Sequence, residues 1–210
     1  MNEWLRPTDS GDHRCWWCGE DAQYQRYHDT EWARPVHSDT ALFEKVCLEG
    51  FQSGLSWITI LRKRENFRQV FENFDIPVVA RFDEKHIQRL LQDSGIVRHR
   101  GKIEATINNA VRAQELISEV GSLTTYFWSF APDIPFGQDG MSSHPSGLAT
   151  TSPSAIALSK DLKKRGWKFV GPTTMYSFMQ SMGLINDHIL GCFVRDECEQ
   201  LRLSALSIHK

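Results

Sequence analysis

Residues 92–102 read QDSGIVRHRGK, a short hairpin bracketed by glycines that separates two segments with helical periodicity. Apolar residues recur at helical spacing on both sides, at Ile87 and Leu90 before the hairpin and at Ile103 and Ile107 after it. The stretch therefore predicts a helix, a hairpin and a second helix. No segment of the sequence alternates as a strand would over a useful length, so the predicted fold class is all-α.

The hairpin also has the composition of a phosphate-binding surface. Gly95 and Gly101 would let backbone N–H groups approach a ligand closely, and the second helix begins with free N–H groups and the positive end of its dipole. Arg98 and Lys102 add side-chain charge. These four residues are therefore candidates for contacts with a DNA backbone, and an ordinary helical corner with a solvated basic turn fits the stretch equally well.

The overall composition limits the classes of function. The 210 residues can bury a substantial core, and the formal net charge of −2 argues against a protein that coats nucleic acid through bulk charge. There is no secretion signal and no apolar stretch that could span a bilayer, so we expect a cytoplasmic protein without a membrane partner. The five cysteines form no dense framework, which favours reduced thiols or a metal site over disulfides.

The domain organisation follows from changes in composition along the chain. Residues 1–12 are polar and are predicted to be a flexible lead, residues 13–195 should form one domain, and residues 196–210 should form a C-terminal tail. Between about 132 and 151, Gly, Ser and Pro replace most apolar residues, which predicts a loop within the domain.

Cysteines and histidines at the two ends of the domain could bind a metal ion. His188 and Cys192 are four residues apart on a predicted helix, which would place an imidazole and a thiolate on one face. Cys15 and His28 supply one more of each and complete a set suited to tetrahedral Zn²⁺. Four protein ligands leave no position for a water, so such a zinc would stabilise the fold and perform no chemistry. Cys18 competes with Cys15, because the two form a CxxC motif.

Glu49 is a carboxylate near the end of an apolar predicted helix. If its side chain points inward it needs a hydrogen-bond donor, and an amino group on a bound base would serve. The alternative interpretation is a solvent-facing glutamate at a helix end.

The chain closely resembles the 3-methyladenine DNA glycosylase I family in several segments between Cys15 and Cys192. They occur in the family's order and spacing, at residues 15–17, 27–32, 47–57, 92–102, 163–171 and 186–192. Two positions depart from the family pattern. Ala33 stands where a glycine is usual after the Glu-Trp pair, and Phe51 replaces a residue that is commonly polar.

The resemblance implies a monofunctional glycosylase of the helix-hairpin-helix superfamily, which acts on double-stranded DNA containing alkylated bases. The sequence does not give the oligomeric state, and we expect a monomer. The resemblance implies an all-helical fold in which one structural Zn²⁺ joins the N- and C-terminal segments. The zinc ligands that it implies exclude Cys18 and are Cys15, His28, His188 and Cys192. It also implies an aromatic pocket for the flipped base, in which Glu49 reads the adenine edge and the enclosing residues are Trp17, Tyr24, Tyr27 and Trp57.

The expected mechanism follows from the charge of the substrate. Methylation at N3 makes adenine a cation, which aromatic faces attract by about 0.5–2 kcal/mol per contact. A cationic base is already a good leaving group, so Glu49 is expected to act mainly by orientation and electrostatics as the catalytic residue. The enzyme must first flip the nucleotide out of the duplex. Leu55 is a candidate wedge for the space left behind, although a leucine is more often part of a core.

Two alternatives to this function remain at the level of sequence. One is a zinc-stapled helix-hairpin-helix module that binds DNA without catalysis. The other is a bifunctional glycosylase-lyase in which Lys102 attacks the sugar. Many helix-hairpin-helix glycosylases use an aspartate after the second hairpin helix, but from Lys102 onward the next aspartate is Asp133.

Overall fold

The computed structural model describes residues 3–134 and 149–209, and it is predominantly helical. The central residues of the predicted loop at 132–151 lie outside the described residues. The secondary-structure elements are, in order, β1 (Leu5–Pro7), β2 (His13–Cys15), η1 (Trp16–Cys18), α1 (Ala22–Thr30), α2 (Asp39–Gln52), α3 (Trp57–Val70), η2 (Glu72–Phe74), α4 (Ile76–Val79), α5 (Glu84–Gln92), α6 (Arg100–Val120), α7 (Leu123–Trp128), α8 (Pro153–Lys164), α9 (Pro172–Ser181) and α10 (Arg195–His209).

The helices begin at residues whose side chains satisfy the free N–H groups of the first turn. Ser38 caps α2, Asp83 caps α5 and Ser152 caps α8, each by accepting a hydrogen bond from a backbone N–H two or three residues on. Pro153 occupies the first position of α8, where its fixed φ suits the helix and its missing N–H costs nothing. Short polar side chains therefore mark where these three helices begin.

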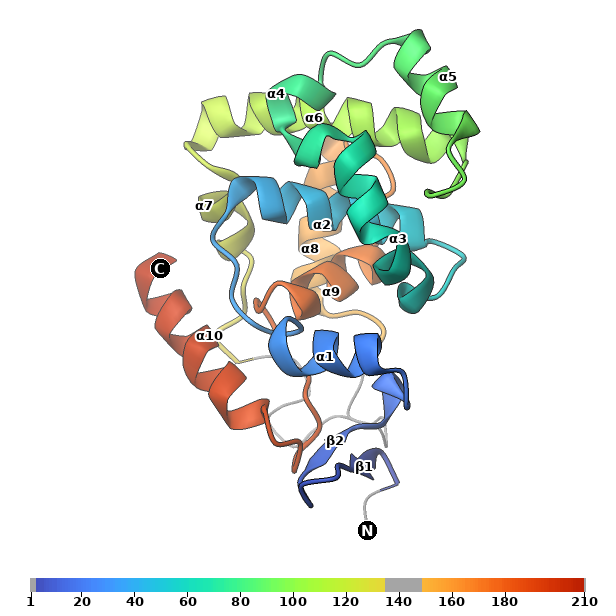
Figure 1. Cartoon of the computed structure of the whole chain (residues 1–210). Helices are drawn as coiled ribbons and strands as arrows, with labels where there is room; N and C mark the ends of the chain where they lie inside the picture. The colour runs from blue at the N-terminus through green and yellow to red at the C-terminus, as the bar shows by residue number, and fades with distance from the viewer. Residues whose placement is uncertain (1–2, 135–148, 210) are drawn as a thin grey trace.

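Helix α2 lies at the centre of the molecule and packs against α3, α6, α7 and α9. Figure 1 shows α6 crossing one end of the molecule, while α1 and the small sheet lie at the other end and α10 lies along one side. Because α2 is surrounded, even its last turn is buried, including Glu49, Gly50 and Phe51. A polar side chain in that turn must find its partners inside the protein. None of the helices in the described parts of the chain is long and apolar enough to cross a membrane.

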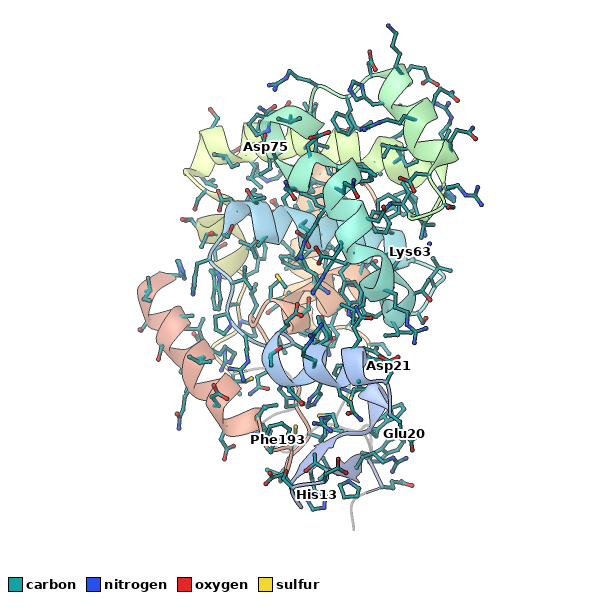
Figure 2. The ribbon with its side chains drawn as sticks, in the orientation of Figure 1. His13, Glu20, Asp21, Lys63, Asp75 and Phe193 are labelled. Carbon is teal, nitrogen blue, oxygen red and sulfur yellow. The ribbon has the colours of Figure 1, made fainter. Side chains whose placement is uncertain are left out.

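The N-terminal strands and the connection between α9 and α10 meet below α1. Strand β1 pairs antiparallel with β2, with Leu5 opposite Cys15, so the segment predicted to be a flexible lead contains a paired strand. Figure 2 shows His13 and Phe193 at this same end, where the Phe193 N–H donates to the His13 carbonyl at 2.9 Å. These two short strands are the part of the fold that an all-α prediction missed.

The segment predicted to be a C-terminal tail is helix α10. Its Cys198, Ala205 and Leu206 are buried, and the buried guanidinium of Arg202 donates to the carbonyl oxygens of Pro132 and Asp133. This helix is therefore packed onto the body of the protein.

The predicted helix-hairpin-helix is present as α5, the turn at residues 93–99 and α6. Asp93 Oδ1 accepts hydrogen bonds from the Gly95 N–H and from Asn66 Nδ2 of α3, which ties the turn to the core. A Cβ on Gly95 would lie 2.2 Å from Asn66 Nδ2, so the close approach of Asn66 requires glycine at this position. The side chain of His99 caps α6 by accepting from the Lys102 N–H.

Candidate functional site

Four metal-ligating residues that are far apart in sequence come together beneath α1. Cys15 ends β2, His28 lies in the last turn of α1, and His188 and Cys192 lie in the connection between α9 and α10. The predicted helix over His188 and Cys192 is wrong. Gly191 has a φ of 96°, which a right-handed helix does not allow, and the Asn186 side chain accepts the His188 N–H in a local turn.

The geometry of this Cys/His cluster fits a tetrahedral metal ion. The donor atoms of Cys15, His28, His188 and Cys192 all lie within 4.8 Å of one another, and all four residues are buried. His188 Nδ1 is 3.6 Å from each sulfur, and His28 Nε2 is 3.5 Å from Cys192 Sγ. Ligands about 2.0–2.3 Å from a common ion are separated by distances of this size. Cys18 donates instead to the Cys15 carbonyl.

The groups around the cluster orient its ligands. His28 Nδ1 is 2.8 Å from Asp29 Oδ1, and His188 Nε2 is 3.3 Å from the Trp32 carbonyl oxygen, so each imidazole presents its other nitrogen to the cluster. A hydrogen bond with Cys192 and burial raise the pKa of Cys15, while the hydrogen bond with Cys15 lowers the pKa of Cys192. The protein groups alone thus favour one thiolate, and a divalent cation would favour both.

A pocket beside the cluster gathers all five residues predicted to bind the base. It has a volume of about 180 Å³ and is lined by the predicted Trp17, Tyr24, Tyr27, Glu49 and Trp57 together with Trp32, Gln52, Ser177 and Gln180. These side chains come from η1, α1, α2, α3 and α9. Pockets for drug-sized ligands usually have volumes of about 300–1,000 Å³, so this one suits a single base better than a whole nucleotide.

Contacts between the aromatic rings fix the walls of this base pocket. The ring centroid of Trp17 lies 5.1 Å from that of Tyr24 and 4.9 Å from that of Trp32, and Tyr27 lies 5.5 Å from Trp57. The Nε1 atoms of Trp17 and Trp57 are buried and make no hydrogen bond within the described residues. The pocket therefore offers several π faces to a ligand.

Glu49 is a buried residue of the pocket lining, and it is paired with a residue that the sequence analysis missed. Lys45, one turn earlier on α2, places Nζ 2.9 Å from Glu49 Oε1. Burial raises the pKa of Glu49 and lowers the pKa of Lys45 to about 8, and the attraction between the two groups opposes both changes. The alternative interpretation of Glu49 as a solvent-facing glutamate is therefore wrong, and its partner within the protein is Lys45, for which the spacing of four residues was the available signal.

Gln180 was not predicted either. Its Nε2 donates to Asp187 Oδ2 at 2.8 Å, and the same oxygen accepts from the Tyr176 hydroxyl at 2.5 Å. The bond to Asp187 uses one of the two N–H groups of the Gln180 amide, so the second N–H and the carbonyl oxygen are not engaged by Asp187.

The base pocket adjoins a second cavity of about 310 Å³. Glu49, Gln52 and Ser177 line both, and residues 53–55 and 173–174 complete the outer one. Leu55 stands at this rim with 44% of its surface exposed. The alternative interpretation of Leu55 as a core residue is therefore wrong.

The hairpin residues separate into two groups. Arg98 is exposed, and Gly95 and Gly101 lie in the backbone of the turn and the first turn of α6. Lys102 is buried, and its ammonium donates to the carbonyl oxygens of Phe51 at 2.8 Å and Ser53 at 2.6 Å. We therefore replace the predicted phosphate contact of Lys102 with a structural role, in which it ties α6 to the end of α2.

Comparison with known proteins identifies the family. The family model described as methyladenine glycosylase matches residues 17–195. The chain is 48% identical over 179 residues to "DNA-3-methyladenine glycosylase 1" of Escherichia coli (strain K12), a match that covers 85% of this chain and 95% of the relative. It is 45% identical over 180 residues to "DNA-3-methyladenine glycosylase" of Haemophilus influenzae, which covers 85% of this chain and 96% of the relative.

A solved structure shares both the sequence and the fold. It is a single-residue variant of 3-methyladenine DNA glycosylase I in complex with 3-methyladenine, with a TM-score of 0.80 and 35% sequence identity. The similarity covers 87% of this chain and 97% of that chain. These matches extend over nearly all of the described residues, so the chain belongs to the methyladenine glycosylase family.

Proposed function

We propose that this protein releases 3-methyladenine from alkylated double-stranded DNA by hydrolysing its N-glycosidic bond, without cleaving the DNA strand. Its family and its relatives make it a DNA-3-methyladenine glycosylase, a hydrolase of N-glycosyl bonds that acts in base-excision repair. The observation that carries the proposal is the pocket in which Trp17, Tyr24, Tyr27 and Trp57 surround the buried Glu49.

The base reaches this pocket by flipping out of the duplex. The aromatic faces attract the positive charge of the N3-methylated base, and Glu49 accepts a hydrogen bond from its exocyclic amine. Since Lys45 binds Glu49 Oε1, the other carboxylate oxygen is the acceptor for the base. Leu55 at the rim fills the space that the flipped nucleotide leaves in the duplex.

Hydrolysis needs little acid catalysis, because the base leaves as a neutral molecule. The pocket holds the base while a water attacks the sugar from the outer cavity, and the Glu49 carboxylate faces both spaces. Glu49 therefore stabilises positive charge on the reacting nucleoside and orients the water.

The Cys/His cluster holds one structural zinc. Two thiolates and two imidazoles with all four positions filled by protein are a donor set that suits Zn²⁺ in structural sites. Cys15 and His28 bind it from the N-terminal segment and His188 and Cys192 from the connection before α10, so the metal would fasten the two ends of residues 13–195 into one domain.

The DNA backbone is held by the hairpin through the backbone N–H groups around Gly95 and Gly101 and the side chain of Arg98. A monomer suffices for this arrangement, since one chain supplies the pocket, the rim and the hairpin. We place the protein in the cytoplasm, where its five cysteines remain reduced.

A base-release assay tests the proposal. DNA treated with a methylating agent is incubated with the protein, and the released bases are separated by chromatography. We expect free 3-methyladenine from methylated DNA and none from untreated DNA. Binding to DNA without base release would favour a non-catalytic binding module. Trapping of a covalent protein–DNA species with borohydride would favour a glycosylase-lyase.

A further inference from the structure

Lys45 lies behind the wall of the base pocket. Its side chain is 7% exposed, and it is not among the residues that line the pocket. It lines a separate cavity of about 270 Å³ on the other side of Tyr27 and Trp57, which contribute to both cavities. A cation is therefore held directly behind two aromatic walls of the base site.

The Lys45 ammonium contacts three groups of the base pocket at once. Its Nζ is 2.9 Å from Glu49 Oε1, it donates to the Tyr27 hydroxyl at 3.1 Å, and it lies 3.1 Å from the centroid of the Trp57 ring. These contacts come from α2, α1 and α3 respectively. One side chain thus sets the charge and the position of most of the groups that would recognise a base.

The other charged groups that line the cavity with Lys45 have partners of their own. Glu31 at the end of α1 pairs with Arg64 of α3, and Glu44 of α2 pairs with Arg68 of α3. Arg34 pairs with Glu197 of α10. From the α9 side, Ser181 and Met182 line the same cavity and carry no charge. Lys45 and Glu49 therefore compensate each other, and the pocket wall is close to neutral while both are ionised.

The charge of the base changes during the reaction. The bound nucleoside carries a positive charge on its methylated base. When the C1′–N9 bond breaks, its electron pair stays on N9, the base becomes neutral and the positive charge moves to the sugar. Water then adds to C1′ and loses a proton. A group that stabilises the cationic base more than the neutral base lowers the energy of the ground state and raises the barrier.

We propose that Lys45 is a positioning residue that sets the charge of the base pocket. Acting through Glu49 and Trp57, its ammonium offsets the negative potential that a cationic base would meet. The aromatic faces then attract the cationic base less strongly than they would without Lys45, and its positive charge moves more readily to the sugar as the bond breaks. This inference rests on the proposed function.

The test compares two probes that differ in charge. They are neutral 3-methyladenine and the permanently cationic 3,9-dimethyladeninium, and their dissociation constants are measured with the parent protein and with Lys45→Met, which keeps the length of the side chain. In the variant we expect the affinity for the cation relative to the neutral base to rise by roughly tenfold or more. Single-turnover release of 3-methyladenine from DNA should slow by a similar factor.

Two control variants separate charge from structure. Lys45→Arg keeps the charge and should restore the parental ratio of affinities. Arg68→Met removes a cation from the same cavity that is paired with Glu44, and it should leave the ratio unchanged. If Lys45→Met weakens both probes equally, Lys45 only supports the structure and the inference is wrong.

If Lys45→Met does not fold, the two dissociation constants can be measured with the unaltered protein at different pH values, because a rise in pH removes the charge of Lys45. Burial lowers the pKa of Lys45 to about 8, while burial raises the pKa of Tyr27 well above its ordinary value. The ammonium is therefore lost as the pH rises through about 8, and the relative affinity for the cation should increase between about pH 7 and pH 9.5. A constant ratio over this range would overturn the inference.

The outcome for the parent protein distinguishes the two proposals. If it releases no 3-methyladenine from methylated DNA, the proposed function fails. If it releases the base and the ratio of affinities responds neither to Lys45→Met nor to pH, only the inference about Lys45 fails.

Discussion

The Cys/His cluster and the base pocket are neighbouring buried polar sites with opposite charge arrangements. In the cluster, two thiols and two imidazoles converge within 4.8 Å, a donor set that could hold a metal ion. In the pocket, the carboxylate of Glu49 is already matched by Lys45 at 2.9 Å. A cation that completes the cluster should be held permanently, whereas a cationic base in the pocket is held only until its bond breaks.

Two tryptophans connect these sites. Trp17 lines the pocket and lies 5.2 Å from the His28 ring, and Trp32 lines the pocket while its carbonyl oxygen faces His188 Nε2. The cluster therefore supports one wall of the pocket. Damage to the cluster should therefore spread to the pocket, whereas changes of charge in the pocket should leave the cluster intact.

The largest effect is expected from breaking the cluster. His188→Ala removes one of four ligands, which should abolish stoichiometric zinc binding and lower the free energy of unfolding by about 3–5 kcal/mol. Metal content and denaturant unfolding measure the two effects. The matched control is Cys18→Ser, which changes a buried cysteine whose thiol donates to the backbone carbonyl of Cys15 and to no ligand atom, and which should keep one zinc per chain. Normal stability of the metal-free protein would contradict the structural role.

The second effect is on catalysis alone. Glu49→Gln preserves shape but loses a charge-assisted hydrogen bond to the base, so single-turnover excision should slow roughly ten- to hundredfold. Zinc content and affinity for undamaged DNA should stay the same. Glu44→Gln is the matched control, since it changes a carboxylate of the same helix that pairs with Arg68 outside the pocket. Excision at the parental rate by Glu49→Gln would move the recognition site elsewhere.

The smallest effects concern the hairpin, which belongs to neither site. Arg98→Ala should weaken binding to all DNA sequences alike and reduce the slope of log affinity against log salt by about 0.9. Lys102→Met should leave this slope unchanged and instead destabilise the fold by about 1.5–3 kcal/mol, because its ammonium bonds the carbonyls of Phe51 and Ser53. A reduced salt slope for Lys102→Met would restore its role as a phosphate contact.

The sequence predicted the helices well because their signals are local. Apolar periodicity and the caps at Ser38, Asp83 and Ser152 act within a few residues of the helix that they start. The helix predicted at His188 and Cys192 failed because the Asn186 turn and the positive φ of Gly191 shape that connection. The strands β1 and β2 were missed because three residues are too short for an alternating pattern to appear.

The candidate site was predictable in its members and less so in its charges. The resemblance to the glycosylase family supplied the four cluster residues and the five pocket residues, and the structure brings each set together. Lys45 was missed because a lysine within an apolar stretch is usually solvated, and only the packing of α1 and α3 around α2 shows that it is buried. Ala33, the predicted departure from glycine, has a φ of 64°, the left-handed region that favours glycine.

The proposed function requires that the base binds in the pocket between α1, α2, α3 and α9. The most direct test is an NMR titration with 3-methyladenine that observes the indole N–H signals of the seven tryptophans. We predict large shifts for Trp17 and Trp57, whose side chains line the pocket, and no shift for Trp128, whose Nε1 donates to the Val36 carbonyl outside it. Unchanged signals of Trp17 and Trp57 at saturating 3-methyladenine would show that the base does not bind in this pocket.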